Sequence, residues 1–247
     1  MITKLLGPVL VLTRISAFFL VAPVFSWQTI PVRIKAAIAL LISVFLSTVV
    51  PSAIDSGQIS ALEAILLISN EAIYGLALGL IAVFIFSVVK LCGEIIENQM
   101  GMAMAEILDP LTGENAQPLS GLLEMIFILL FLIANGHHLL LLIMSRSYEA
   151  FPVGTIPTIP RLAEGTIEAA STMFIASLRF AAPMLAAFLV LLVTLAVFAR
   201  IIPDMDILFI SLPLSIGLGL LMTGLFLPFI SEFVGEFADL MGKLLPL

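Results

Sequence analysis

Long apolar runs separated by short polar breaks dominate the pattern of this sequence. The runs are too unbroken for the strands of a membrane β-barrel, which would show about ten residues of alternating polarity. Prolines interrupt or close most of them, and proline breaks or kinks a helix because it lacks the backbone N–H. The pattern predicts an all-α fold of membrane-type helical hairpins with about six apolar segments, at residues 5–25, 36–50, 61–89, 121–144, 162–202 and 207–233.

The polar stretch of residues 90–120 stands apart from these runs and separates the third segment from the fourth. It holds five of the seventeen acids but only one base, Lys90, and three methionines alternate within it beside a glycine. Proline, glycine and asparagine in its second half favour turns over helix. An apolar protein that keeps such a stretch at its centre is expected to use it. We therefore interpret residues 90–120 as a central polar and methionine-rich loop region.

The lengths of the segments differ from those of a simple bundle of membrane spans. The second has about fifteen residues and the third about 29, whereas a hydrocarbon core of ~30 Å requires about twenty. Lysine and arginine divide evenly between the two sides of a six-span arrangement, so the positive-inside rule predicts no orientation. We expect that not every segment is an ordinary bilayer-spanning helix. No internal repeat or linker divides the chain, which predicts a single integral domain over residues 1–247.

Composition agrees with a membrane protein and excludes several other classes. Hydrophobic residues make up 62% of the chain and charged residues 11%, whereas soluble domains carry roughly 25% charged residues. The net charge of −7 argues against a nucleic-acid partner, which would require a basic face. A single cysteine excludes an internal disulfide and any four-cysteine metal site. Arg14 lies inside the first apolar segment and no small-residue cleavage pattern follows, so we expect no cleaved signal peptide.

Charged residues within the apolar segments are the first candidates for chemistry. Each costs about 2.5–3.5 kcal/mol to insert at the centre of a membrane helix, so each needs a partner or a function. They are compatible with an ion or proton relay, and also with structural ion pairs between helices or subunits, which we favour. The charges concerned are Arg14, Glu63, Glu71, Glu124 and Arg179, of which Arg14, Glu71 and Arg179 are our candidates for buried or interface charges.

Two local patterns in the third segment predict how its helix begins and packs. Ser60 and Glu63 have the spacing of a capping box, in which each side chain binds a backbone N–H near the other residue. Gly75 and Gly79 form a GxxxG pattern, and small residues at that spacing permit close contact with another helix. We expect this glycine face to be a helix-packing surface.

Residue patterns typical of an enzyme or a cofactor site are missing from the sequence. His137 and His138 are adjacent, so on a helix they point about 100° apart, and no carboxylate lies nearby to complete a metal site. The sequence also lacks a phosphate-binding GxxxxGK[ST] loop and a GxSxG nucleophile elbow. We predict a protein without catalytic residues, metal or cofactor.

The methionines of the central stretch have two interpretations. Methionine fills irregular gaps in a core, but core residues recur with helical spacing, whereas these three alternate. Alternation is typical of a looped or extended segment. Flexible apolar side chains suit a deformable seal that opens around a polypeptide passing through a pore. We hypothesise that the methionines line a closed pore and that the loop after them plugs it. The residues of this hypothesis are Met100, Met102, Met104, Glu106, Asp109, Pro110, Gly113 and Glu114.

Several phrases, in the right order over nearly the whole chain, resemble the FliR/SctT family. Each phrase is weak alone, and their ordered combination is specific. After the last of them this chain has Asp204-Met205-Asp206 where the family usually has Gln-Met-Asn, which makes the loop acidic and leaves the expected fold unchanged. The phrases are RISAFFLVAPVF at 14–25, IPVRIK at 30–35, GEII at 93–96, QMG at 99–101, DP at 109–110, LFL at 130–132, NGHH at 135–138, FPVG at 151–154 and ARIIP at 199–203.

This resemblance implies a non-enzymatic subunit of the flagellar type III protein export gate, in the bacterial inner membrane at the flagellar basal body. It implies assembly with FliP- and FliQ-like subunits and docking with FlhB- and FlhA-like proteins, in contact with membrane lipid. The cargo implied is unfolded flagellar export substrates. The resemblance further implies helical hairpins that pack in a spiral around a closed pore, much of it lifted out of the bilayer plane. Such an arrangement would account for the unusual segment lengths.

Three alternatives remain open from the residues. The nearest is the equivalent subunit of the injectisome, a related type III secretion system. A small-molecule or ion transporter would be built around Glu63, Glu71 and Arg179. An intramembrane hydrolase would use the pair Glu94 and Glu97 together with the histidines.

Overall fold

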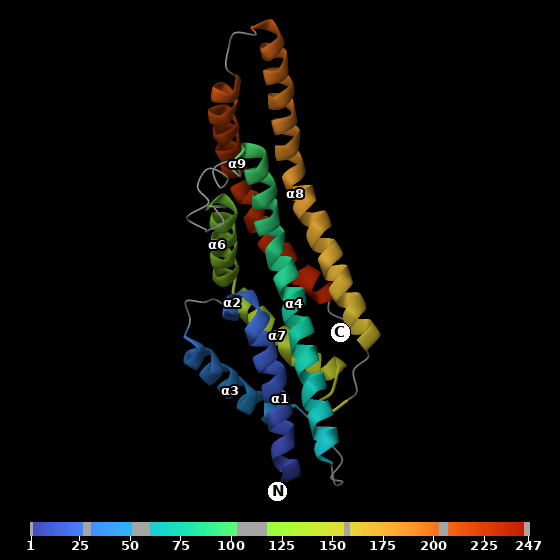
Figure 1. Ribbon diagram of the computed structural model, residues 1–247. Helices are drawn as coiled ribbons and strands as arrows, with labels where there is room; N and C mark the ends of the chain where they lie inside the picture. Colours follow the sequence, from blue (N-terminus) through green and yellow to red (C-terminus); the bar gives the residue numbers. More distant parts are fainter. Residues whose placement is uncertain are drawn as a thin grey trace. The chain divides into compact units, whose positions relative to one another are not determined.

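The computed structural model describes residues 2–26, 31–50, 60–102, 118–155, 159–202 and 207–244, and it confirms the predicted all-α fold (Figure 1). Four of its helices are long and apolar enough to cross a membrane, or five if the broken pair α6 and α7 forms one span. The helices are α1 (Ile2–Val21), α2 (Pro23–Ser26), α3 (Val32–Val49), α4 (Ala61–Met100), α6 (Pro118–Ile133), α7 (Gly136–Ala150), α8 (Ile159–Ile201) and α9 (Ile207–Leu244).

The first helix of interest, α4, is longer than the apolar pattern predicts. It continues past the predicted end of the third segment to Met100, so the first part of the central stretch is helix and not loop. Cys92, Ile96 and Met100 are buried at intervals of four residues, which is a helical period. Glu97 is also buried on this face, and a charged residue there disguises the period in the sequence.

The predicted fourth segment, residues 121–144, is two helices and not one. α6 ends at Ile133 and α7 begins at Gly136, and Asn135 between them has the left-handed backbone angle φ of 58°. Asparagine adopts this conformation more readily than most residues with a side chain. A Cβ atom at Gly136 would overlap the ring of Phe131, so the break also requires a glycine. The NGHH phrase therefore marks a helix break.

The remaining helices correspond to the other predicted segments with different ends. α1 and α2 together cover the first segment, α3 begins four residues before the second, and α8 begins three residues before the fifth. α9 continues beyond the predicted sixth segment to Leu244, and it contains both Pro213 and Pro228. Each proline removes one backbone hydrogen bond without ending the helix.

The chain divides into two compact units that are interleaved along the sequence. Unit 1 comprises Met1–Ile85, Phe131–Ser171 and Glu236–Leu247, and unit 2 comprises Phe86–Leu130 and Thr172–Gly235. Because neither unit is one continuous stretch of chain, the division does not correspond to two successive domains. That residues 1–247 form a single integral domain stays a prediction.

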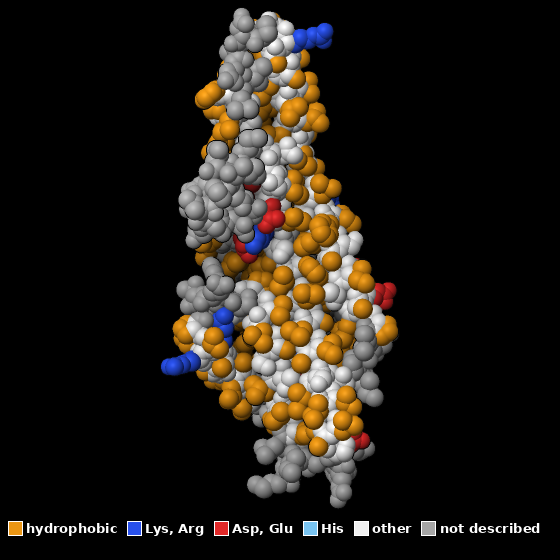
Figure 2. Space-filling view, viewed as in Figure 1, with side chains coloured by type: hydrophobic (Ala, Val, Ile, Leu, Met, Phe, Trp, Pro, Cys, Tyr) orange, Lys and Arg blue, Asp and Glu red, His pale blue; other side chains and the backbone are white. Residues whose placement is uncertain are grey.

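Unit 2 is held together by aromatic side chains from four helices. The ring of Phe127 on α6 lies 5.3 Å from Phe86 on α4 and 5.8 Å from Phe233 on α9, between ring centroids. Phe180 on α8 contacts Phe226 and Phe233 of α9 edge-on, at 5.6 Å and 5.0 Å. Edge-to-face pairs at these separations are favourable beyond the area that they bury. On the face that Figure 2 shows, hydrophobic side chains are spread over the described helices and charged ones are few, unlike the surface of a soluble protein.

Candidate functional site at the base of segment 103–117

Within unit 2, α4 ends at a glycine cap immediately before residues 103–117, the part of the central stretch that lies outside the described residues. Gly101 has a φ angle of +76°, a conformation that glycine adopts without strain. Its N–H binds the carbonyl of Asn98, and the N–H of Met102 binds the carbonyl of Glu97, both at 3.3 Å. This pair of bonds is the Schellman arrangement that terminates helices. The QMG phrase is thus a helix stop.

The side chain of Glu97 connects the end of α4 to the start of α6. Its Oε1 atom accepts a hydrogen bond from the backbone N–H of Leu119, in the first turn of α6. The first N–H groups of a helix have no partner within the helix and carry partial positive charge, so a carboxylate is well placed there. Glu97 is 3% exposed, and its other oxygen has no hydrogen-bond partner within the described residues. One buried acid therefore holds the two ends of segment 103–117 together.

Further along the same helix pair, small and charged residues reinforce this junction. A Cβ atom at Gly93 would lie 2.7 Å from the Cα of Ser120, so the backbones of α4 and α6 approach closely. Lys90 and Glu124 form an ion pair of 3.6 Å between Nζ and Oε2, with both side chains partly exposed. An exposed pair of this kind contributes about 0–1 kcal/mol. Glu124, predicted as a charge in an apolar segment, thus has a partner on α4.

The methionines of the hypothesised seal differ in how deeply they are buried. Met100 is 1% exposed and packs against Gly219 of α9, where an added Cβ would overlap its side chain. In the isolated chain Met100 is therefore a core residue, as the core-filling interpretation has it. Met102 is half-buried in the turn after the helix. The other residues of the seal hypothesis lie outside the described residues, namely Met104, Glu106, Asp109, Pro110, Gly113 and Glu114.

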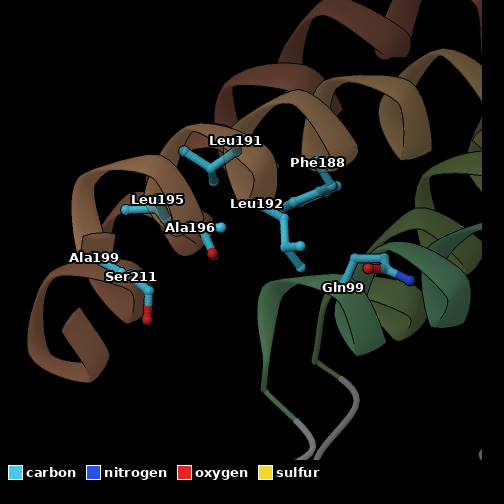
Figure 3. Close-up of a pocket in the computed structure, with 9 residues that line it drawn as sticks. Gln99, Phe188, Leu191, Leu192, Leu195, Ala196, Ala199 and Ser211 are labelled. Carbon is cyan, nitrogen blue, oxygen red and sulfur yellow. The ribbon is translucent and has the colours of Figure 1, made fainter. Parts of the chain in front are cut away.

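An apolar cavity of about 350 Å³ lies beside the end of α4 (Figure 3). Gln99 forms one side, and the last third of α8 with the start of α9 forms the other. Its few polar groups are the amide of Gln99 and the hydroxyls of two serines of α9. The lining residues are Gln99, Phe188, Leu191, Leu192, Leu195, Ala196, Ala199, Ser211 and Ser215.

In unit 1, Arg14 and Glu71 form a buried ion pair. The Nε atom of Arg14 donates to Oε2 of Glu71 at 2.6 Å, and the two side chains are 0% and 1% exposed. The pair joins α1 to α4. The structure therefore brings together two of the three charges that the sequence singles out as buried or interface charges.

The remaining polar atoms of this pair are bonded to α7 and the turn that follows it. Arg14 donates to the carbonyl of Ser147 at 3.3 Å and to that of Phe151 at 3.0 Å, while Glu71 accepts from the N–H of Gly154 at 3.2 Å. The FPVG phrase supplies two of these backbone groups. Sequence reasoning missed them because a backbone donor or acceptor leaves no trace in residue identity.

Two tyrosine rings enclose the Arg14 guanidinium. Its central carbon lies 4.3 Å from the centroid of Tyr148 and 5.0 Å from that of Tyr74, distances at which a cation is attracted to a ring face. The hydroxyl of Tyr148 donates to the carbonyl of Val11 at 3.3 Å, which ties α7 back to α1. We call Arg14, Glu71, Tyr74, Ser147 and Tyr148 the arginine cluster.

The two glycines of the GxxxG pattern face α1 within the same chain. A Cβ atom at Gly75 would overlap the backbone carbonyl of Arg14, and one at Gly79 would lie 2.9 Å from Cβ of Val21. The small residues therefore let α4 approach the backbone of α1, which sets the position of Arg14 relative to Glu71. Glu63 forms the predicted capping box, with its Oε2 2.8 Å from the N–H of Ser60.

Arg179, the third of the predicted buried or interface charges, lies on the exposed surface of α8 in the single chain, so its assignment to an interface stays a prediction. It faces outward because both turns beside it bury small or apolar residues in its place, Ser177 and Ala181. The rings of His137 and His138 lie 4.2 Å apart between centroids and are tilted by 48° to one another. Within the described residues, no group of histidines, cysteines and acids is arranged to hold a metal.

The comparison with known proteins decides the family. Residues 5–241 match the family of bacterial export proteins, family 1. The chain belongs to this family. It is 32% identical to the flagellar biosynthetic protein FliR of Bacillus subtilis, over 86% of this chain and 83% of that protein. It is 29% identical to the FliR of Pectobacterium carotovorum, over 94% and 90%, and 29% identical to that of Escherichia coli, over 90% and 84%. The resemblance to a family of export proteins is thus confirmed across almost the whole length.

Proposed function

We infer that this protein is a subunit of the flagellar type III protein export gate in the bacterial inner membrane. The family match over residues 5–241 carries this inference, because it runs through all of the helices and not through one segment. The flagellar relatives align over more than four-fifths of both chains, so the likeness is not to a fragment. A structural component of an export apparatus needs no catalytic residues, and we propose that the protein is not an enzyme.

We further propose that it works only in an assembly with FliP- and FliQ-like subunits, docked to FlhB- and FlhA-like proteins. The apolar stretches of α3, α8 and α9 support this, because only 17% of each is buried within the chain. Lipid or the apolar helices of other subunits must cover so much exposed apolar surface. Unfolded flagellar proteins would then pass through a pore to which this chain contributes one part.

Within the gate, we propose that the methionines at the end of α4 and after it line the closed pore and that the loop of residues 106–117 plugs it; of these methionines, Met100 packs in the core of the isolated chain. The junction made by Glu97 supports this role, because it holds both ends of the segment against a rigid helix pair. The glycine stop at Gly101 lets the chain leave α4 sharply. A segment anchored at its base is suited to open and close while its supporting helices remain folded.

Co-purification from native membranes tests the proposed assembly. A tagged copy of this chain should restore swimming to a strain that lacks its own gene, and should recover FliP- and FliQ-like proteins from detergent extracts. Restored secretion of injectisome substrates without swimming would instead assign the chain to the injectisome. If the purified chain alone moves an ion or small molecule into liposomes, the transporter alternative replaces the gate.

A further inference from the structure

Arg179 is a cation in the middle of the apolar helix α8, and it is exposed in the single chain. It makes no ion pair or hydrogen bond within the part of the chain that the structure describes. Arg14 and Lys90 are ion-paired. The other cations with described side chains lie near helix ends, where water or headgroups reach them: Arg33, Lys35, Arg146 and Arg200. Arg179 alone of these needs an anion that the described residues do not provide, since a bare charge is costly in an apolar environment.

A proline changes the backbone at the same position. Pro183 lies inside α8, four residues after Arg179. In an α-helix the N–H of each residue binds the carbonyl four residues earlier, and proline has no N–H. The carbonyl oxygen of Arg179 therefore lacks its usual donor. This turn of α8 therefore offers the N–H groups of the Arg179 guanidinium as donors and the carbonyl oxygen of Arg179 as an acceptor.

The residues around Arg179 leave room for another helix. Ala182 and Ala186 are exposed and share its face of α8 by helical spacing. Small residues at such positions let a second helix approach closely. On the other side, Ile175 and Leu178 are 66% and 56% exposed, so the same face also offers apolar area.

The exposed face of α8 is apolar close to Arg179 and polar nearer the start of the helix. Phe174, Ile175 and Leu178 are exposed in the turns before Arg179, and the exposed Ser171 and Glu168 lie two to three turns before it. After Arg179 no charged residue follows until Arg200. A lipid phosphate and a carboxylate on a neighbouring helix are both anions that a guanidinium at this position can bind. The small residues Ala182 and Ala186 on the same face favour the neighbouring helix.

We propose that this face of α8 docks an apolar helix of another export-gate subunit, and that this helix carries a carboxylate opposite the Arg179 guanidinium. A guanidinium binds a carboxylate through two parallel hydrogen bonds, which fixes both the height and the rotation of the partner helix. The inference rests on the proposed function, because it requires a multi-subunit gate. We call the surface the Arg179 face: Ile175, Leu178, Arg179, Ala182, Pro183 and Ala186.

Charge substitutions measure the contribution of this contact. Arg179→Gln and Arg179→Glu should lower the recovery of one partner subunit by about tenfold or more, because each leaves a carboxylate desolvated and unpaired. Arg179→Lys should retain part of the recovery. Arg200→Gln, which removes the same charge from another exposed position of α8, is the matched control and should leave recovery unchanged. Since Arg179 is exposed and makes no ion pair or hydrogen bond within the described residues, the melting temperature of the isolated chain should not change in any variant.

Crosslinking identifies the occupant. A photo-reactive phenylalanine analogue at Leu178, in the assembled gate, should crosslink to an apolar helix of another subunit, and Arg179→Gln should abolish this product. A basic substitution in that helix, selected as a suppressor of Arg179→Glu, should restore swimming. Crosslinks to lipid alone, or full recovery of partners with Arg179→Glu, would overturn the proposal. If the wild-type chain recovers no gate subunits and restores no swimming, the proposed function fails, which is a separate result.

Discussion

Arg14 shows how a full charge is kept inside an apolar unit. Its Nε, Nη1 and Nη2 atoms all donate hydrogen bonds, to Glu71, Ser147 and Phe151, and aromatic rings enclose its flat faces. Removing a charge from water is expensive, and it is tolerated only when the remaining donors and acceptors are also bonded. The arginine cluster meets that condition with groups from α1, α4, α7 and the turn after α7.

Replacing Arg14 should therefore destabilise unit 1 strongly. Arg14→Ala leaves the Glu71 carboxylate buried without its cation, which costs about 3–5 kcal/mol in comparable pairs. We expect a lower melting temperature in detergent, less protein in the membrane and reduced swimming. Adding Glu71→Gln to this variant should restore part of the stability, because it removes the unpaired charge. Arg146→Ala, at an exposed position of α7, should change little. A wild-type melting temperature for Arg14→Ala would show that water reaches the cluster.

The contact between α1 and α4 depends on glycine at one turn of α4. The atom in the way of a Cβ at Gly75 is a backbone carbonyl, which cannot rotate aside as the end of a side chain does. The helices would have to separate, and the distance between Arg14 and Glu71 would increase with them. The packing of α4 against α1 and the ion pair between Arg14 and Glu71 are therefore coupled.

Alanine substitutions at glycines test this coupling. Gly75→Ala should destabilise the protein by about 1–3 kcal/mol through overpacking. Gly217→Ala on α9 is the control, because a Cβ there meets nothing within 4 Å, and it should stabilise its helix by about 0.5–1 kcal/mol. The measurement is thermal unfolding of each purified variant. The larger Gly75→Leu or Gly79→Leu should also block recovery of the export gate, and equal stability of the two alanine variants would disprove the close approach.

At the scale of the whole molecule, buried contacts between helices join the two ends of segment 103–117. Glu97 binds the start of α6, Gly93 lets the two backbones meet, and Met100 packs on α9. These contacts hold helices α4, α6 and α9 of unit 2 together around the two ends of segment 103–117. The supporting helices would remain folded if the segment moved.

Shortening the segment tests the proposed plug. Deleting residues 111–117 should leave the gate assembled but leaky, because the junction at Glu97 lies outside the deletion. The expected result is ion conductance and poor growth when the variant is produced together with its partners. Met102→Ala and Met104→Ala should leak less, since part of the seal remains. Met100→Ala is a separate case, because emptying its buried position should cost about 2–5 kcal/mol of stability.

A tight membrane with the deletion present, and with normal assembly, would contradict the plug. The segment would then be better explained as a docking surface for another protein. Dye uptake and growth of the same strain, with and without the partner subunits, separate these outcomes.

The sequence by itself determined the fold class, the family and most helices of this protein. Apolar runs of this length have few solutions other than α-helices in a membrane or a membrane-like assembly, because backbone groups in an apolar environment must bond within their own segment. The capping box at Ser60 and Glu63 and the glycine face of α4 were also predictable, since each is a pattern of residue types three or four positions apart.

Only the tertiary structure decided which charges meet and where helices stop. Arg14 and Glu71 lie 57 residues apart along the chain, and Arg14 binds carbonyls more than 130 residues away. Sequence periodicity carries no information on such pairs, whose partners include backbone atoms common to every residue type. The polar end of α4 is anchored because Glu97 accepts a hydrogen bond from α6, and Arg179 is exposed because Ser177 and Ala181 occupy the buried face of α8 beside it. In both cases the environment, and not the residue type, determines whether a charge is buried.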